Sequence, residues 1–268
     1  MYVVFDVGGT TTRIACSKTG RTFDEVTKIP TASSEAGFEA FVAQLQAEIN
    51  GRKVKAVAGG LPGHLDGEGA LQQVPNLLGW QGLPVQARLE AALGAPVYLQ
   101  NDTALVGLGE ATHGAGRGYG LVVYITVSTG VNGARLVDGH IDRSMTGFEL
   151  GCMLLPDESG RLVTLESLTG GAALQHRYGQ PPRELRDPAI WHREARYLAR
   201  ALHTTLLHWS PEVVIYGGSM MRDIPLTSIS RELSELPWVF EYTPELKLAE
   251  LGDNGGLYGA LALLASKR

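Results

Sequence analysis

Short apolar runs alternate with amphipathic stretches along the first hundred residues. The runs at 2–5, 11–17, 54–58 and 97–100 have the length and apolar content of strands. A Ser-Ser-Glu start followed by apolar residues at helical spacing predicts an amphipathic helix over 35–49. This alternation of strands and helices favours a mixed sheet covered by helices, and therefore an α/β fold.

The second half of the chain opens with the same pattern as the first. Strand patterns on either side of a glycine turn indicate a duplicated architecture. We expect two lobes, residues 1–102 and 103–253, with the helix at about 254–268 packing back on the first. The elements expected in the second half are strands at 121–127, 132–137, 140–142 and 213–216 and helices over 165–177, 189–209 and 255–266.

Two glycine-centred turns stand about half a chain apart. Residues 6–11 read Asp-Val-Gly-Gly-Thr-Thr, and residues 128–133 read Ser-Thr-Gly-Val-Asn-Gly. Such turns expose several backbone N–H groups to one point, and small side chains let a phosphate oxygen approach them. Asn101-Asp102 lies between the two turns, directly after a strand. This arrangement indicates a nucleotide clamped between two lobes, with a carboxylate that deprotonates the group receiving phosphate.

Composition and charge argue against several classes of protein. The 268 residues are 44% hydrophobic and 19% charged, as in an ordinary globular protein. The net charge of −5, without a basic run, argues against a nucleic-acid partner. The longest apolar stretches, 121–127 and 257–265, are much shorter than the roughly 20 residues that span a bilayer. The N-terminus lacks the pattern of a signal peptide, so we expect a cytoplasmic protein without a membrane partner.

Cysteines and histidines are too few, and too irregularly placed, to predict a disulfide framework or a metal site. Cys16 and Cys152 are the only cysteines. The seven histidines show neither a two-histidine helix motif nor paired-cysteine spacing, so no protein-bound zinc is expected.

Five motifs together resemble the ordered signature of the ROK family, which contains repressors and sugar kinases. Each motif alone is weak, and the specificity lies in their order and spacing over almost the whole chain. The resemblance implies the two-lobed actin-like ATPase fold, also called ribonuclease H-like, with sugar and ATP in an interlobe active-site cleft. In chain order the motifs are Asp6-Val7-Gly8-Gly9-Thr10, Pro75-Asn76-Leu77 with Gly79-Trp80, Asn101-Asp102, Ser128-Thr129-Gly130, and Gly147-Phe148-Glu149-Leu150-Gly151.

The resemblance also implies which residues bind the phosphoryl donor. Backbone groups of the two turns would hold the β and γ phosphates, and Asp6 would position Mg²⁺ through water, since Mg²⁺ keeps much of its hydration shell. A glycine pair after the strand at 213–216 fits an adenosine-binding turn, because the backbone can then lie under purine and ribose. The implied donor-side residues are Gly8, Gly9, Thr10, Thr11, Thr129 and Gly130 for phosphate and Gly217 and Gly218 for adenosine.

On the acceptor side, we assign Asp102 as the general base on the sugar hydroxyl, a role that contributes roughly 10²- to 10⁴-fold in rate. A carboxylate such as Glu149 or Glu166 can accept hydrogen bonds from two adjacent sugar hydroxyls. By resemblance, the sugar site is lined by Gly63, Asn76, Asn101, Asp102, Glu149 and Glu166.

Each assignment has a purely structural alternative. The turn at residues 6–11 can be an ordinary hairpin turn, and Gly217-Gly218 can be a plain strand-to-helix turn. Asn101-Asp102 precedes a helical run at 104–111 and can act as its cap. Glu149 can be a solvated loop residue, and Glu166 an acid favoured at a helix N-terminus.

The chain departs from the family pattern on the acceptor side. Cys152 stands where the family carries a histidine after Gly151, and residues 154–161 replace a three-cysteine zinc motif upstream of Glu166. We therefore expect no structural zinc and an atypical sugar-reading segment. We expect Cys152 to be a small buried residue rather than a ligand contact.

The expected activity is ATP- and Mg²⁺-dependent transfer of the γ-phosphoryl group to a hexose hydroxyl, the 6-OH of glucose or of an N-acetylhexosamine. A non-catalytic sugar-sensing regulator and an actin-like ATPase switch remain open. Repressors of the family carry an N-terminal DNA-binding helix-turn-helix, whereas this chain enters a strand at residue 2, and a switch would not need Glu149 or Asn76. The sequence does not identify the sugar, nor decide between ATP, another nucleotide and polyphosphate. A homodimer is implied by resemblance alone.

Overall fold

Residue contacts divide the chain into two compact units. The computed structural model describes residues 1–74 and 76–267. Unit 1 comprises Met1–His113, Met145–Gly147 and Asp253–Arg268, and unit 2 comprises Gly114–Ser144 and Phe148–Gly252. The first segment of unit 1 ends at His113, the last residue of the helix that follows Asn101. Within the described part of the chain, no helix is both long enough and apolar enough to cross a bilayer.

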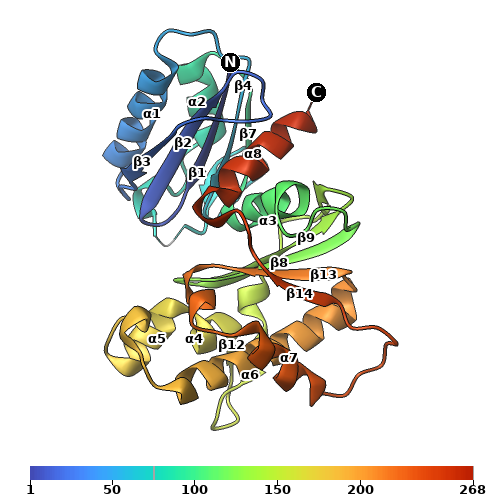
Figure 1. Cartoon of the computed structure of the whole chain (residues 1–268). Coiled ribbons are helices and arrows are strands. Elements are labelled where there is room, and N and C mark those ends of the chain that lie inside the picture. Colours follow the sequence, from blue (N-terminus) through green and yellow to red (C-terminus); the bar gives the residue numbers. More distant parts are fainter. Residues whose placement is uncertain (75, 268) are drawn as a thin grey trace. The chain divides into compact units, whose positions relative to one another are not determined.

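Unit 1 is built on a five-stranded mixed sheet in the order β3-β2-β1-β4-β7 (Figure 1). The pairs β1–β2 and β2–β3 are antiparallel, whereas β1–β4 and β4–β7 are parallel. Helices α1 and α2 share one hydrophobic core with the sheet, and α8 packs on β1 and β4 together with α3. The elements are β1 (Tyr2–Val7), β2 (Thr11–Ser17), β3 (Val26–Pro30), α1 (Glu35–Ile49), β4 (Ala56–Leu61), α2 (Val85–Leu93), β7 (Val97–Asn101), α3 (Asp102–His113) and α8 (Gly255–Ala265).

The sequence around α1 accounts for its boundaries and its packing. The Ser34 side chain accepts a hydrogen bond from the Gly37 N–H at 3.1 Å, which caps the first turn. The helix ends at Asn50, which adopts the left-handed conformation (φ 48°). Phe41 on its buried face meets the rings of Phe5 and Trp80 with centroids 5.1 and 5.7 Å apart.

Helices α3 and α8 lie against each other through glycines. A Cβ atom on Gly259 would overlap the Leu105 carbonyl oxygen, and one on Gly109 would overlap the Gly255 carbonyl oxygen. Only residues without a side chain permit this approach. The contact fixes the first residue of α3, Asp102, relative to the first turn of α8.

Unit 2 repeats the sheet of unit 1. Its strand order is β10-β9-β8-β13-β14, and two antiparallel pairs are again followed by two parallel ones. The duplicated architecture predicted from the two glycine turns is therefore confirmed. The elements are β8 (Leu121–Val127), β9 (Val131–Val137), β10 (His140–Ile141), α4 (Leu165–Thr169), α5 (Gly171–Tyr178), α6 (Pro188–Trp209), β13 (Val213–Gly217), α7 (Leu226–Ser234) and β14 (Glu245–Leu248).

Short elements complete both units. Two small hairpins, β5–β6 and β11–β12, project from the connections between larger elements. Their strands are β5 (His64–Leu65), β6 (Leu71–Gln72), β11 (Leu154–Pro156) and β12 (Leu162–Thr164), and the 3₁₀ turns are η1 (Leu78–Trp80), η2 (Leu150–Cys152), η3 (Pro182–Glu184), η4 (Ser219–Arg222) and η5 (Gly252–Asn254).

The helix expected over 165–177 is broken in two, so that prediction is wrong. Gly170 has an extended backbone (φ −67°, ψ 144°) that ends α4 and starts α5. The first N–H groups of α5, those of Gly171 and Ala172, donate to the carbonyls of Ser128 and Thr129. These tertiary bonds would be lost in a continuous helix, where each N–H bonds within the helix.

Candidate functional site

The β1–β2 turn presents backbone donors at the end of the unit 1 sheet. The Gly8 N–H closes the turn by donating to the Thr11 carbonyl at 3.0 Å, one step beyond the Val7–Thr12 pair of the ladder. Gly9 and Thr10 are exposed, and among the described residues their N–H groups have no acceptor. The turn therefore offers two adjacent unused donors, the arrangement that binds a phosphate oxygen.

Asp6, the last residue but one of β1, lies between two glycines. A Cβ on Gly60 would lie 3.2 Å from Asp6 Oδ1, and one on Gly256 would lie 2.6 Å from Asp6 Oδ2. Burial, and then the charge of Asp102, raise the pKa of Asp6 to about 7, while Arg13 opposes the rise. This partly desolvated carboxylate suits a cation. Among the residues that the structure describes, no cluster of three metal-ligating side chains occurs, and a Mg²⁺ contact of Asp6 stays a prediction.

Asn101 and Asp102 join β7 to α3 directly beside Asp6. The Asn101 Oδ1 accepts a hydrogen bond from the Ala104 N–H at 3.1 Å, and its Nδ2 donates to the Gly63 carbonyl at 2.9 Å. Asn101 therefore caps α3, which is the structural role considered as the alternative, and its side chain also holds the Gly63 loop. Asp102 Oδ1 accepts from the Thr103 N–H at 2.6 Å. Gly60 brings the two acids together, because a Cβ on it would also lie 3.2 Å from Asp102 Cα.

The loops that carry Gly63 and Asn76 are fixed from within unit 1. Gly63 has a φ of +80°, and a Cβ on it would lie 2.6 Å from Val74 Cγ1, so this position needs glycine. Asn76 lies beside the β1–β2 turn, because a Cβ on Gly9 would be 3.3 Å from Asn76 Nδ2. Pro75 of the same motif lies outside the described residues. Unit 1 thus brings Asp6, Gly9, Gly63, Asn76, Asn101 and Asp102 into one neighbourhood.

Arg13 is a neighbour of this site that the sequence analysis did not identify. It stands opposite Asp6 in the β1–β2 register, and it pairs with Asp253 at 2.9 Å. Asp253 also accepts from Lys28 at 3.0 Å, and these two bonds lower its pKa. The pairs tie β2 and β3 to the start of α8. The sequence does not reveal these pairs, because the partners are more than 200 residues apart and meet only in the folded unit.

In unit 2, the β8–β9 turn is the counterpart of the β1–β2 turn of unit 1. The Ser128 N–H donates to the Gly130 carbonyl at 2.8 Å, and the carbonyls of Ser128 and Thr129 accept from α5 at 2.7 and 2.9 Å. Within the described chain, the N–H groups of Thr129 and Gly130 have no acceptor. As in unit 1, two adjacent donors remain unused.

The carboxylate of Glu166 contacts this turn. Its Oε2 accepts a hydrogen bond from the Val131 N–H at 2.9 Å, and a Cβ on Gly130 would overlap the same oxygen. Gly130 therefore has no room for a side chain. The sequence analysis assigned Glu166 to the sugar and missed its contact with the turn. Its sugar contact stays a prediction.

The segment from Glu149 to Cys152, which contains η2, packs against β9. Glu149 accepts a hydrogen bond from the Asn132 side chain, and Gly151 sits directly on the Val131 carbonyl oxygen, which a Cβ would overlap. Cys152 is exposed, so the expectation that it is buried is wrong. Desolvation, followed by the charges of Glu149 and Glu166, raises the pKa of the Cys152 thiol.

Gly217 and Gly218 end β13 and are constrained within unit 2. A Cβ on Gly217 would overlap the Tyr124 hydroxyl, and Gly218, with a φ of +93°, lies against the Val127 carbonyl. Packing within unit 2 thus requires both glycines, which agrees with the alternative that they form a plain strand-to-helix turn. Their contact with adenosine stays a prediction.

Residues 154–161, which replace the cysteine motif, belong to the β11–β12 hairpin and its turn. Asp157 Oδ1 organises this turn by accepting from the N–H groups of Ser159 and Arg161 at 2.9 and 3.0 Å. Glu158, in the same turn, accepts from Arg193 Nε of α6 at 3.0 Å. The hairpin is therefore held to the unit 2 core by hydrogen bonds and an ion pair.

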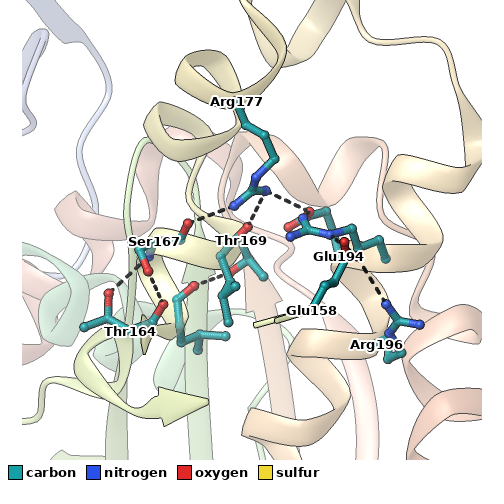
Figure 2. A network of polar contacts seen from close by, with 10 residues as sticks. Glu158, Thr164, Ser167, Thr169, Arg177, Glu194 and Arg196 are labelled. Carbon is teal, nitrogen blue, oxygen red and sulfur yellow. Dashed lines mark hydrogen bonds and ion pairs between the residues drawn. The ribbon is translucent and has the colours of Figure 1, made fainter. Parts of the chain in front are cut away.

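An ion-pair network centred on Glu194 connects this hairpin to α4, the helix that carries Glu166 (Figure 2). Glu194 is fully buried, and its Oε1 lies 2.8 Å from Arg193 and 3.8 Å from Arg177. Arg177 also donates to the carbonyls of Leu168 and Ser167 at the end of α4, at 2.9 and 3.0 Å. The network thus joins the hairpin that replaces the cysteine motif to the helix that carries Glu166.

The network predicts a pH-dependent stability. Burial raises the pKa of Glu194 to about 7, against the opposing charges of Arg193 and Arg177. Since the folded state then holds a proton that the unfolded state releases near pH 4.5, stability falls as pH rises from 4.5 through 7. The fall attributable to Glu194 is up to about 3 kcal/mol.

Urea unfolding at pH 5, 6, 7 and 8 measures this dependence. We expect Glu194→Gln to show a flatter profile than the wild type, because the amide has no charge to desolvate. Asp6→Asn serves as a comparison for the second raised carboxyl, which lies in unit 1. Equal slopes in Glu194→Gln and the wild type would contradict the prediction.

Comparisons with known proteins agree with this geometry. A model of the ROK family matches residues 2–267. The bifunctional enzyme NanE/NanK of Brucella melitensis biotype 1 is 31% identical over 98% of this chain and 54% of the relative, so the chain spans about half that relative's length. The N-acetyl-D-glucosamine kinase of Citrobacter koseri is 29% identical over 98% of this chain and 99% of the relative.

Among solved structures, a ROK hexokinase from Thermus thermophilus matches with a TM-score of 0.81 and 31% identity, covering 99% of both chains. The predicted α/β, two-lobed actin-like ATPase fold is confirmed. The family match extends over almost the whole sequence and includes all five motifs. This chain belongs to the ROK family.

Proposed function

We propose that this protein is an ATP-dependent sugar kinase that transfers the γ-phosphoryl group to a hexose hydroxyl, the 6-OH of glucose or of an N-acetylhexosamine. The observation that carries the proposal is the pair of carboxylates in unit 1. Asp6 and Asp102 flank Gly60, next to a turn with two unused N–H donors. A base and a cation-binding acid beside a phosphate cradle are what phosphoryl transfer to an alcohol requires.

Asp102 acts as the base in this proposal. Its carboxylate accepts the proton of the acceptor hydroxyl as that oxygen attacks the γ-phosphorus, while the bond from phosphorus to the leaving oxygen of ADP breaks. Because Asp102 Oδ1 is held by the Thr103 N–H, the carboxylate keeps a fixed orientation at the start of α3. The N–H groups of Gly9 and Thr10 stabilise charge on the phosphate oxygens.

Asp6 is suited to hold Mg²⁺ through water. When bound, the ion neutralises charge on the phosphates of the donor. Glu149 and Glu166 in unit 2 are the proposed acceptors of hydrogen bonds from sugar hydroxyls, supported by their hydrogen bonds to the adjacent β9 residues Asn132 and Val131.

A panel of sugars tests the proposal. Glucose, fructose, mannose, N-acetylglucosamine and N-acetylmannosamine are each supplied with ATP or polyphosphate and Mg²⁺, and ADP and sugar phosphate are quantified. We expect at least one hexose to accelerate ATP consumption well above the sugar-free rate. If no sugar does so, but calorimetry detects sugar binding, a sensing protein replaces the kinase. Sugar-independent ATP hydrolysis would instead favour an ATPase switch.

A further inference from the structure

Asn132 is the second residue of β9 and lies three positions after Thr129 of the phosphate turn. Its half-buried amide takes part in three hydrogen bonds. Oδ1 accepts from the Gly133 N–H at 2.8 Å and from the Leu150 N–H at 3.1 Å. Nδ2 donates to Glu149 Oε2 at 3.2 Å. One side chain therefore holds both the backbone and the carboxylate of the Glu149–Leu150 segment.

The chemistry of an amide matches this double task. Asparagine carries an acceptor and a donor on one short, planar group. Aspartate has the same shape and keeps the acceptor, but it presents a second oxygen where the carboxylate of Glu149 needs a donor. A hydrogen bond from a neutral amide to a carboxylate is stronger than one between two neutral groups.

The neighbouring residue of β9 makes an analogous contact. The Val131 N–H donates to Glu166 Oε2 at 2.9 Å, just as Asn132 donates to Glu149. Both carboxylates that we propose as sugar ligands are thus bonded to the first two residues of the strand that leaves the Thr129–Gly130 turn. Acceptor-side and donor-side groups of unit 2 share one rigid element.

We propose that Asn132 is a positioning residue, whose amide orients the Glu149 carboxylate to receive the acceptor sugar. The proposal rests on the sugar-kinase function proposed above. Holding Oε2 restricts rotation of the carboxylate, so that less conformational freedom is lost when the sugar binds. Asn132 itself does not touch the sugar in this role.

Asn132→Asp tests the proposal with minimal change of shape. At pH 8 the new carboxylate faces Glu149 across a hydrogen-bond distance, and the two charges repel. We expect KM for the preferred panel sugar to rise about tenfold, while kcat falls less than threefold and KM for ATP stays within twofold.

Two controls separate positioning from a general effect. Asn50→Asp adds the same charge at the exposed end of α1 in unit 1 and is expected to leave KM unchanged. In a double-mutant cycle, Asn132→Asp is added to Glu149→Ala, where it should cost nothing more because its target is gone. Thermal unfolding of every variant reports the folded fraction at the assay temperature.

The outcomes distinguish this inference from the function on which it rests. Absence of sugar phosphorylation by the wild type contradicts the kinase proposal and the role of Asn132 with it. With an active wild type, an equal cost of Asn132→Asp in the presence and absence of Glu149 overturns the positioning role alone. An unchanged KM also overturns it.

Discussion

Replacing Asp102 with alanine is expected to lower kcat by about 10²- to 10⁴-fold while ATP and sugar still bind. Asp102 is the first residue of α3 and lies across Gly60 from Asp6. In the proposed reaction it removes the proton of the attacking hydroxyl, and no water molecule can replace a base held at a fixed position with the same efficiency. Initial rates at saturating ATP and sugar give kcat, and calorimetry gives the two dissociation constants.

Asp102→Asn provides the isosteric test of the same residue. It preserves the acceptor for the Thr103 N–H and removes only the basic oxygen, so we expect the same loss of turnover. Asp24→Asn removes an equal charge at an exposed position of unit 1 and should leave kcat unchanged. A near-normal kcat in either Asp102 variant would rule out its assignment as the general base.

The second large effect is expected at the contact between α3 and α8. Gly259→Ala is expected to reduce the free energy of unfolding by about 3 kcal/mol or more, because its Cβ overlaps the Leu105 carbonyl oxygen and the two helices must separate. Backbone atoms cannot move aside as a flexible side chain can. Urea unfolding followed by circular dichroism measures the change.

Gly67→Ala is the matched control for this substitution. A Cβ on Gly67 meets no atom within 4 Å, so the change in unfolding free energy should stay within about 0.5 kcal/mol. We also expect Gly259→Ala to lower kcat in the folded fraction, because α3 begins with Asp102. A Gly259→Ala protein as stable as Gly67→Ala would show that the helices can adjust without cost.

Local chemistry was sufficient to predict the elements that have strong signals of their own. The capping serine and apolar spacing of α1 predicted its range, and the two glycine turns predicted paired strands on both sides. Helix α7 and strand β14 were not predicted. Pro225, the residue before α7, makes no side-chain cap, and β14 has only four residues. Their placement depends on packing against β13 and α6, which the local sequence does not specify.

The candidate site shows the same limit at the level of side chains. Motif order placed Asp6, Asn101 and Asp102 in one family pattern, and the structure brings them together. Asn132 and Arg13 were missed because their partners become neighbours only through strand register and a returning loop. The exposure of Cys152 is likewise a property that residue type alone does not reveal.

The break between α4 and α5 affects the donor strength of the β8–β9 turn. The Ser128 carbonyl and the Thr129 N–H belong to one peptide group, as do the Thr129 carbonyl and the Gly130 N–H. Because both carbonyls accept bonds from the start of α5, each peptide group is polarised and its N–H becomes a better donor. An anion bound at the turn would therefore be stabilised by the positive end of the α5 dipole through these two peptide groups, and not by direct contact with the helix. An uninterrupted helix would have consumed these N–H groups internally and left the turn with weaker donors.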